Sequence, residues 1–86
     1  MTRILLYTQP GCLSCELMKV FLEAQNISFE EFDTLADTAA RTQLLEKYGS
    51  NTTPTVVVLT TGGTEEKTEV ITGFDPERLD QALSAA

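Results

Sequence analysis

The sequence predicts an α/β fold, with a four-stranded mixed sheet and helices on both faces of the sheet. Short, dense apolar runs typical of buried strands alternate with longer segments in which apolar residues recur at helical spacing. A Gly-Gly pair joins the last two runs as a hairpin would. The predicted order is β-α-β-α-β-β-α. Since 86 residues have room for one hydrophobic core, we expect residues 1–86 to form a single domain.

The first strand is predicted at Arg3–Thr8, where apolar side chains occupy both faces, as in a central strand covered by helices. The Gln-Pro-Gly sequence at 9–11 ends this strand. From Cys12 to about Gln25, apolar residues recur every three or four positions, which predicts a helix. Cys12 and Cys15 therefore lie at the start of that helix.

The middle of the chain is predicted to hold a half-exposed strand and a second helix. Apolar and polar residues alternate over Ile27–Asp33, as in a strand with one buried face. The helix is predicted at Asp37–Tyr48, with Gly49 as its C-terminal stop. Its expected inner face consists of Ala40, Leu44, Leu45 and Tyr48.

A β-branched run at Thr55–Thr60 predicts another buried strand, and the Gly-Gly turn at 62–63 pairs it with a strand at about Lys67–Thr72. The charged tract 64–67 is expected at the exposed end of this hairpin, without a function of its own. Asp75 as N-cap and Pro76 as first helical residue predict a final helix, with the tail 84–86 frayed.

Crossover helices make the first two strands parallel, whereas the hairpin makes the last two antiparallel. This order, with a Cys-x-x-Cys at the first strand-to-helix junction, indicates the thioredoxin fold.

Composition excludes several functions. The chain has 6 basic and 13 acidic residues and a net charge of −7, which argues against binding to nucleic acid. Its N-terminal apolar run is too short for a membrane span or an export signal, so we expect a cytoplasmic protein with no membrane partner. In the cytosol, two closely spaced cysteines indicate redox or metal chemistry rather than a structural disulfide.

The position of Cys12 favours redox chemistry. A thiol at a helix N-terminus faces unpaired N–H groups and the positive end of the helix dipole, which stabilise its thiolate. Thiols in Cys-x-x-Cys motifs have pKa values of about 3.5–7.5 rather than about 8.5. We therefore predict that Cys12 attacks a disulfide and that Cys15, one turn further on, resolves the mixed disulfide. Glu16, near Cys12, is expected to oppose thiolate formation unless it pairs with Lys19.

Spacing alone leaves open a packing pair or half of a metal site. With 0 histidines and 2 cysteines, the chain lacks the ligands for a closed zinc site, and we expect no bound metal. An iron–sulfur cluster carrier remains an alternative, in which Cys12 of two chains and an outside thiol such as glutathione supply the ligands.

Three motifs in order resemble the glutaredoxins and the related NrdH-type redoxins. They are residues 7–15 (Tyr-Thr-Gln-Pro-Gly-Cys-Leu-Ser-Cys), 53–55 (Thr-Pro-Thr) and 73–76 (Gly-Phe-Asp-Pro). The resemblance implies that Pro54 is cis against the active-site disulfide and that the backbone of Thr53 pairs with the substrate's cysteine. It further implies that the loop 73–75 holds the γ-glutamyl end of glutathione. Asp75 fits this role, and it equally fits that of an ordinary helix N-cap.

The resemblance thus implies a thiol–disulfide oxidoreductase that reduces protein or small-molecule disulfides. Glutathione-specific members commonly have a Lys at the position of Gln9 and an aromatic residue at that of Ser14, so glutathione is expected to bind weakly. The electron source is either glutathione or, as for NrdH-type redoxins that feed ribonucleotide reductase, thioredoxin reductase. We expect a monomer without a bound cofactor. Besides the catalytic Cys12 and Cys15, the predicted substrate-binding residues are Thr8, Gln9, Thr53, Pro54, Gly73, Phe74 and Asp75.

Overall fold

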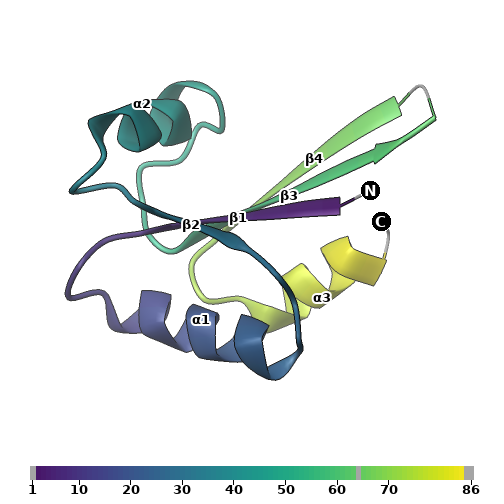
Figure 1. The fold of residues 1–86 in the computed structure, drawn as a ribbon, viewed down its shortest axis with the longest axis horizontal. Coiled ribbons are helices and arrows are strands. Elements are labelled where there is room, and N and C mark those ends of the chain that lie inside the picture. Colours follow the sequence, from purple (N-terminus) through teal and green to yellow (C-terminus); the bar gives the residue numbers. More distant parts are fainter. Residues whose placement is uncertain (1, 64, 85–86) are drawn as a thin grey trace.

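The computed structural model describes residues 2–63 and 65–84. Its elements follow the predicted β-α-β-α-β-β-α order (Figure 1). They are β1 (Thr2–Thr8), α1 (Leu13–Ala24), β2 (Glu30–Asp33), α2 (Thr38–Glu46), β3 (Thr55–Gly62), β4 (Glu65–Thr72) and α3 (Pro76–Ser84).

The four strands form one mixed sheet in the order β2-β1-β3-β4. β1 pairs parallel with β2, as the α1 crossover requires, and antiparallel with β3, while β3 and β4 form the predicted hairpin. β1 and β3 are therefore the central strands, which explains why their sequences are apolar on both faces. The mixed sheet and the thioredoxin-like fold class are confirmed.

Two layers of helices cover the sheet: α1 and α3 lie on one face and α2 on the other (Figure 1). One buried cluster lies between the sheet on one side and helices α1 and α3 on the other. It is formed by Ile4, Leu6, Met18, Leu22, Val56, Val58, Ile71 and Leu79. Beneath α2 lies a second cluster, formed by Leu5, Tyr7, Ala40, Leu44 and Val57. Successive residues of β1 alternate between the two clusters, so packing on both faces fixes the strand that leads to Cys12.

Three predicted boundaries are corrected. β2 begins at Glu30 rather than at Ile27, because its pairing with β1 starts only there; Ile27 and Phe29 instead pack from the preceding connection against the α1 side of the core. α2 ends at Glu46, and Leu45, expected on its inner face, is 43% exposed. The part of the charged tract at 65–67 belongs to β4.

α3 extends to Ser84, one residue into the segment predicted to fray. Thr64 and residues 85–86 lie outside the described part of the chain. Within the described part, no helix has the length and apolar character needed to span a membrane.

Candidate active site

Cys12 and Cys15 form a disulfide at the start of α1, with their Cα atoms 5.2 Å apart. Gly11, whose positive φ of 76° suits glycine, turns the chain out of β1 just before them. Cys12 is the N-cap of α1, and its Sγ accepts a hydrogen bond from the Cys15 N–H at 3.2 Å. Cys12 is partly exposed, whereas Cys15 is 1% exposed. An incoming disulfide can therefore reach Cys12, with Cys15 behind it.

Thr53 flanks the exposed sulfur. Its carbonyl oxygen lies 3.7 Å from the Sγ of Cys12, and its hydroxyl donates to the same sulfur at 3.8 Å. The Thr53–Pro54 peptide bond is cis, as the family resemblance implied, and Pro54 is buried at the start of β3. The structure thus brings two of the three motifs together at Cys12.

The third motif lies next to Pro54, because the N–H of Gly73 donates to the Pro54 carbonyl at 2.8 Å. Phe74 is 40% exposed, and its ring meets that of Phe21 edge-on at 6.4 Å. Asp75 caps α3, its Oδ1 accepting from the Arg78 N–H at 3.1 Å. Asp75 is therefore an N-cap, and contact with a substrate stays a prediction for Gly73, Phe74 and Asp75.

Thr8 and Gln9 differ in accessibility. Thr8 is 4% exposed, and its hydroxyl donates to Glu31 at 3.0 Å while its carbonyl accepts from the backbone and hydroxyl of Thr34. Thr8 therefore supports the site from within the sheet. Gln9 is exposed and lines, together with Thr53, a cavity of about 180 Å³ on the α2 side.

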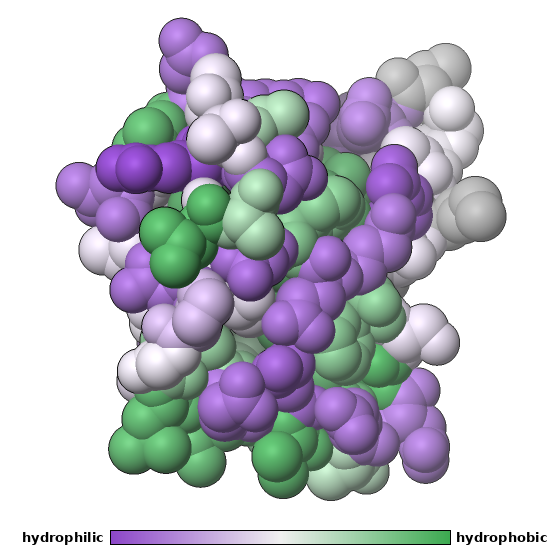
Figure 2. All heavy atoms as spheres, turned by 60° about the vertical axis from the view of Figure 1, so that its left-hand side comes forward, coloured by the Kyte–Doolittle hydropathy of each residue, from purple (hydrophilic) through white to green (hydrophobic). Residues whose placement is uncertain are grey.

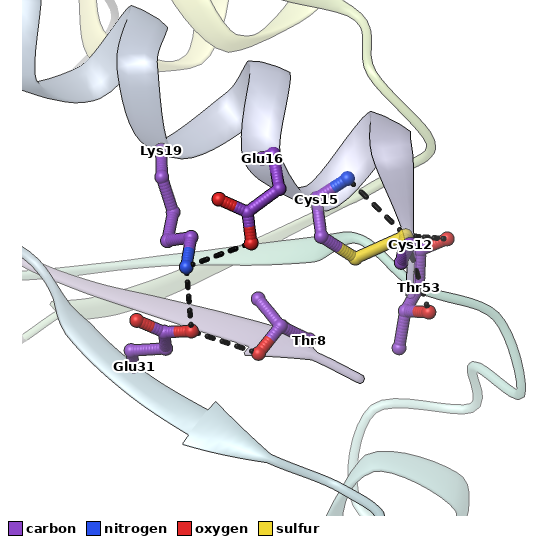
Figure 3. A network of polar contacts seen from close by, with 7 residues as sticks. All are labelled: Thr8, Cys12, Cys15, Glu16, Lys19, Glu31 and Thr53. Carbon is purple, nitrogen blue, oxygen red and sulfur yellow. Dashed lines mark hydrogen bonds and ion pairs between the residues drawn. A yellow bond between two sulfur atoms is a disulfide. The ribbon is translucent and has the colours of Figure 1, made fainter. Parts of the chain in front are cut away.

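A charged network beside the cysteines joins α1 to the sheet (Figure 3). The ammonium of Lys19 lies 3.0 Å from a carboxylate oxygen of Glu16 and 3.4 Å from one of Glu31, which in turn accepts from Thr8. The hydrogen bond to Glu16, with smaller contributions from Glu31, raises the pKa of Lys19 above its usual value. Glu16 thus has the partner that the sequence allowed for, and its charge near Cys12 is offset.

Sequence reasoning missed Glu31 in this network. Glu31 lies 23 positions from Thr8 along the chain, and only the parallel pairing of β1 with β2 brings them together. Over residues 2–63 and 65–84, no group of three or more Cys, His, Asp or Glu side chains is arranged to hold a metal ion.

The fold and the cysteine pair define a protein of the thioredoxin-fold redox class, with the site geometry that thiol–disulfide exchange requires. A family model described as Glutaredoxin matches residues 4–61, two thirds of the sequence. The chain belongs to the glutaredoxin family.

Individual proteins similar to this chain carry thioredoxin-like or redoxin names. The prophage-derived thioredoxin-like protein YosR of Bacillus subtilis is 30% identical over 81 residues, covering 94% of each chain. A mutant form of the thioredoxin-like protein BC3987 is 42% identical, with a TM-score of 0.77 over 94% of this chain and 99% of that one. NrdH-redoxin from Escherichia coli shares the fold at 24% identity, with a TM-score of 0.66 and 92% of each chain covered.

Proposed function

We propose that this protein is an enzyme that reduces disulfides by dithiol exchange, with Cys12 as nucleophile and Cys15 as resolving cysteine. The observation that carries the proposal is the difference in access between two bonded sulfurs: Cys12 is partly exposed at a helix N-terminus, and Cys15 is buried within reach of it. The N-terminal N–H groups of α1, including the Cys15 N–H already directed at the Cys12 sulfur, stabilise a Cys12 thiolate.

The exchange proceeds in two balanced steps. The Cys12 thiolate attacks one sulfur of the substrate disulfide, forming a mixed disulfide and releasing the other substrate sulfur as a thiolate. Cys15 loses its proton and attacks the Cys12 sulfur, which releases the second substrate thiolate and leaves the Cys12–Cys15 disulfide. Two electrons pass from the protein dithiol to the substrate, and the substrate thiolates take up protons. The structure corresponds to the oxidised product state.

Thr53 is proposed to orient the substrate during the first step. Its carbonyl is adjacent to the attacking sulfur, where it can accept a hydrogen bond from the backbone of a bound cysteine. Gly73, tied to Pro54, extends this edge toward Phe74. We propose that the substrates are disulfide-containing proteins. We further propose that the protein acts in the cytosol, where other thiols are kept reduced.

The electron source is proposed to be thioredoxin reductase or glutathione, and one experiment separates them. The oxidised protein is supplied with NADPH and thioredoxin reductase, or with NADPH, glutathione and glutathione reductase, and the appearance of two thiols is followed. We expect thioredoxin reductase to be the better donor, because Gln9 supplies no charge for the carboxylates of glutathione. Failure of both donors would refute this part of the proposal.

The alternative of a cluster carrier depends on Cys12 acting as a ligand. Its partial exposure allows two copies of the chain to share a cluster with two outside thiols. Anaerobic purification distinguishes the two functions: a brown protein with visible absorbance favours the carrier. A colourless protein that loses disulfide reduction in Cys12→Ser favours the enzyme.

A further inference from the structure

The outer face of α1 is apolar. Leu13, Leu17, Val20 and Ala24 follow one another at intervals of three or four residues, so they lie along one side of the helix. All four are exposed, Leu13 by 74%, Leu17 by 45% and Val20 by 64%. Figure 2 shows green hydrophobic side chains at the lower end of the molecule, the height at which Figure 1 places α1. We call these four residues the α1 stripe.

The packing of α1 does not account for the stripe. The helix buries Cys15, Met18 and Leu22 on its opposite side, against the sheet. A helix at a protein surface ordinarily has one apolar face toward the core and a polar face toward water. α3 follows this rule, since its exposed residues, from Glu77 to Ser84, are all polar. Exposed apolar residues that lie side by side, as on α1, indicate a contact surface.

Acidic side chains border the stripe on both sides. Glu16 and Glu23 lie three positions after stripe residues and so on one side of it. Phe21 lies on the other side and lines an open groove of about 300 Å³ between α1 and α3, with Glu77 and Asp80 in its wall. No Lys or Arg is among the residues that the structure describes as lining this groove. On a chain of net charge −7, such borders attract a positively charged surface.

These charges decide between two kinds of occupant. A second copy of the chain would present the same stripe, so that acidic borders would face acidic borders. Like charges that meet across an interface lower its affinity. Lys19, the only cation in the sequence of α1, is already held by Glu16 and Glu31. A different protein, with Lys or Arg beside its own apolar residues, fits both the stripe and its borders.

The stripe begins at the residue after the nucleophile. Leu13 is the first residue of α1, and Cys12 is its N-cap. At 1.5 Å per residue, the stripe extends about 17 Å along the helix from there. It lies apart from Thr53 and Gly73, which border Cys12 from other segments of the chain. A polypeptide held along the stripe therefore has one end at the exposed sulfur of Cys12.

We propose that the α1 stripe docks protein substrates through an amphipathic segment in which Lys or Arg borders apolar side chains, and so holds the substrate disulfide at Cys12. The proposal rests on the proposed disulfide reduction and adds the class of substrate to it. Helical segments suit the surface, because apolar side chains at helical spacing match those of α1. Glutathione is too small to reach along the stripe, and it gains nothing from this contact.

The test uses three synthetic amphipathic helical peptides, each joined by a Gly-Ser linker to one cysteine in a mixed disulfide with 2-nitro-5-thiobenzoate. One peptide has a Leu face bordered by Lys, the second a Leu face bordered by Glu, and the third a Ser face bordered by Lys. Attack of the reduced Cys12 on the peptide sulfur forms the mixed disulfide and releases the coloured thiolate, and Cys15 then releases the peptide thiol.

We expect the Leu–Lys peptide to half-saturate the reaction at a concentration on the order of tenfold below that of the other two, as for loss of one well-packed interface contact. The maximal rate should be the same for all three, because the chemistry at Cys12 is unchanged. The advantage of Lys over Glu should shrink as salt is added. Equal half-saturating concentrations for the three peptides would overturn the proposal.

The matched variants are Leu17→Gln with Val20→Gln and, as a control, Leu35→Gln with Leu45→Gln. The control pair has similar exposure, 69% for Leu35 and 43% for Leu45, and lies outside α1. The stripe variant should lose the advantage of the Leu–Lys peptide without a change in maximal rate, and the control should keep it. A preference that persists in the stripe variant, or an equal loss in both variants, would contradict the proposal.

Two further measurements distinguish the remaining outcomes. Both variants should reduce 5,5′-dithiobis(2-nitrobenzoate) at the wild-type rate; if wild type fails to reduce it, the proposed dithiol chemistry is wrong, and if only the peptide preference is missing, the docking surface alone is wrong. Sedimentation should give a monomer that does not bind phosphatidylcholine vesicles. A dimer or vesicle binding that the stripe variant abolishes would reassign the stripe to a second copy or to a lipid surface.

Discussion

Lys19 holds the carboxylate of Glu16 at 3.0 Å, one turn into the helix that Cys12 caps. The same ammonium reaches Glu31 on the neighbouring strand, so a single cation offsets two anions beside the active site (Figure 3). In a chain of net charge −7, this arrangement limits the negative field that a Cys12 thiolate would otherwise face.

Lys19→Met should therefore slow the reaction of reduced Cys12 with iodoacetamide at neutral pH. Removal of the cation leaves Glu16 and Glu31 unbalanced, and both disfavour the thiolate. Because exposed charges are screened, we expect a loss of about two- to fivefold rather than orders of magnitude. Lys19, whose pKa is raised, stays charged from pH 6 to pH 9. The difference should therefore be largest near and below the pKa of the Cys12 thiol and fade at higher pH, where both proteins hold the thiolate.

The control for this prediction is the double variant Glu16→Gln with Lys19→Met, which removes one anion with the cation. Its alkylation rate should return most of the way to wild type. If Lys19→Met reacts as fast as wild type throughout that pH range, the network has no influence on Cys12.

Because of Tyr7, the free energy of unfolding of the oxidised protein should decrease at alkaline pH. Burial, with smaller effects of Tyr48 and Glu30, raises the pKa of Tyr7 to about 12, compared with 10.0 ordinarily. Below pH 10 both folded and unfolded chains hold this proton, and above it the unfolded chain releases the proton first. The free energy of unfolding, measured in urea, should therefore fall between pH 10 and pH 12.

Tyr7→Phe is the matched variant, because it removes the ionising group and leaves the ring. At neutral pH it should be less stable by about 1 kcal/mol, since Gln43 loses the hydroxyl that donates to it at 2.7 Å. Its free energy of unfolding should decline less steeply above pH 10. An unchanged slope would contradict the assignment to Tyr7.

Gly73→Ala should destabilise the loop that meets Pro54. Gly73 has a φ of 77°, and its surroundings leave space for a methyl group, so the cost is one of backbone conformation alone. We expect a loss of about 1–2 kcal/mol in the free energy of unfolding. Gly62→Ala is the control, because that site has similar space without a positive φ, and it should change stability little. Equal effects at both sites would contradict the conformational explanation.

Much of the fold was predictable because apolar patterns reflect burial directly. β1 and β3 are apolar on both faces since each lies between two layers of helices. The start of β2 was wrong because Ile27 and Phe29 alternate as strand residues do, although they pack from a connection that lies outside the ladder. Periodicity reports which side chains are buried, whereas a strand also needs a partner.

The candidate site was likewise predictable where it depends on adjacent residues, and not where it depends on residues far apart in the sequence. The place of Cys12 at a helix start follows from a few adjacent residues. The contact of Thr53 with Cys12 spans 41 positions, and it was anticipated only through the family resemblance. Neither source indicated the cavity that Gln9 and Thr53 line, whose walls come from four separate segments of the chain.

The central claim is that Cys12 attacks and Cys15 resolves, and trapping of the mixed disulfide tests it most directly. Reduced Cys15→Ser and Cys12→Ser are each mixed with a peptide disulfide, and the products are identified by intact mass and peptide mapping. We predict that Cys15→Ser accumulates a stable mixed disulfide at Cys12, while the buried Cys15 of the Cys12→Ser variant forms little or none. Accumulation at Cys15 in Cys12→Ser, with no adduct at Cys12 in Cys15→Ser, would contradict the account.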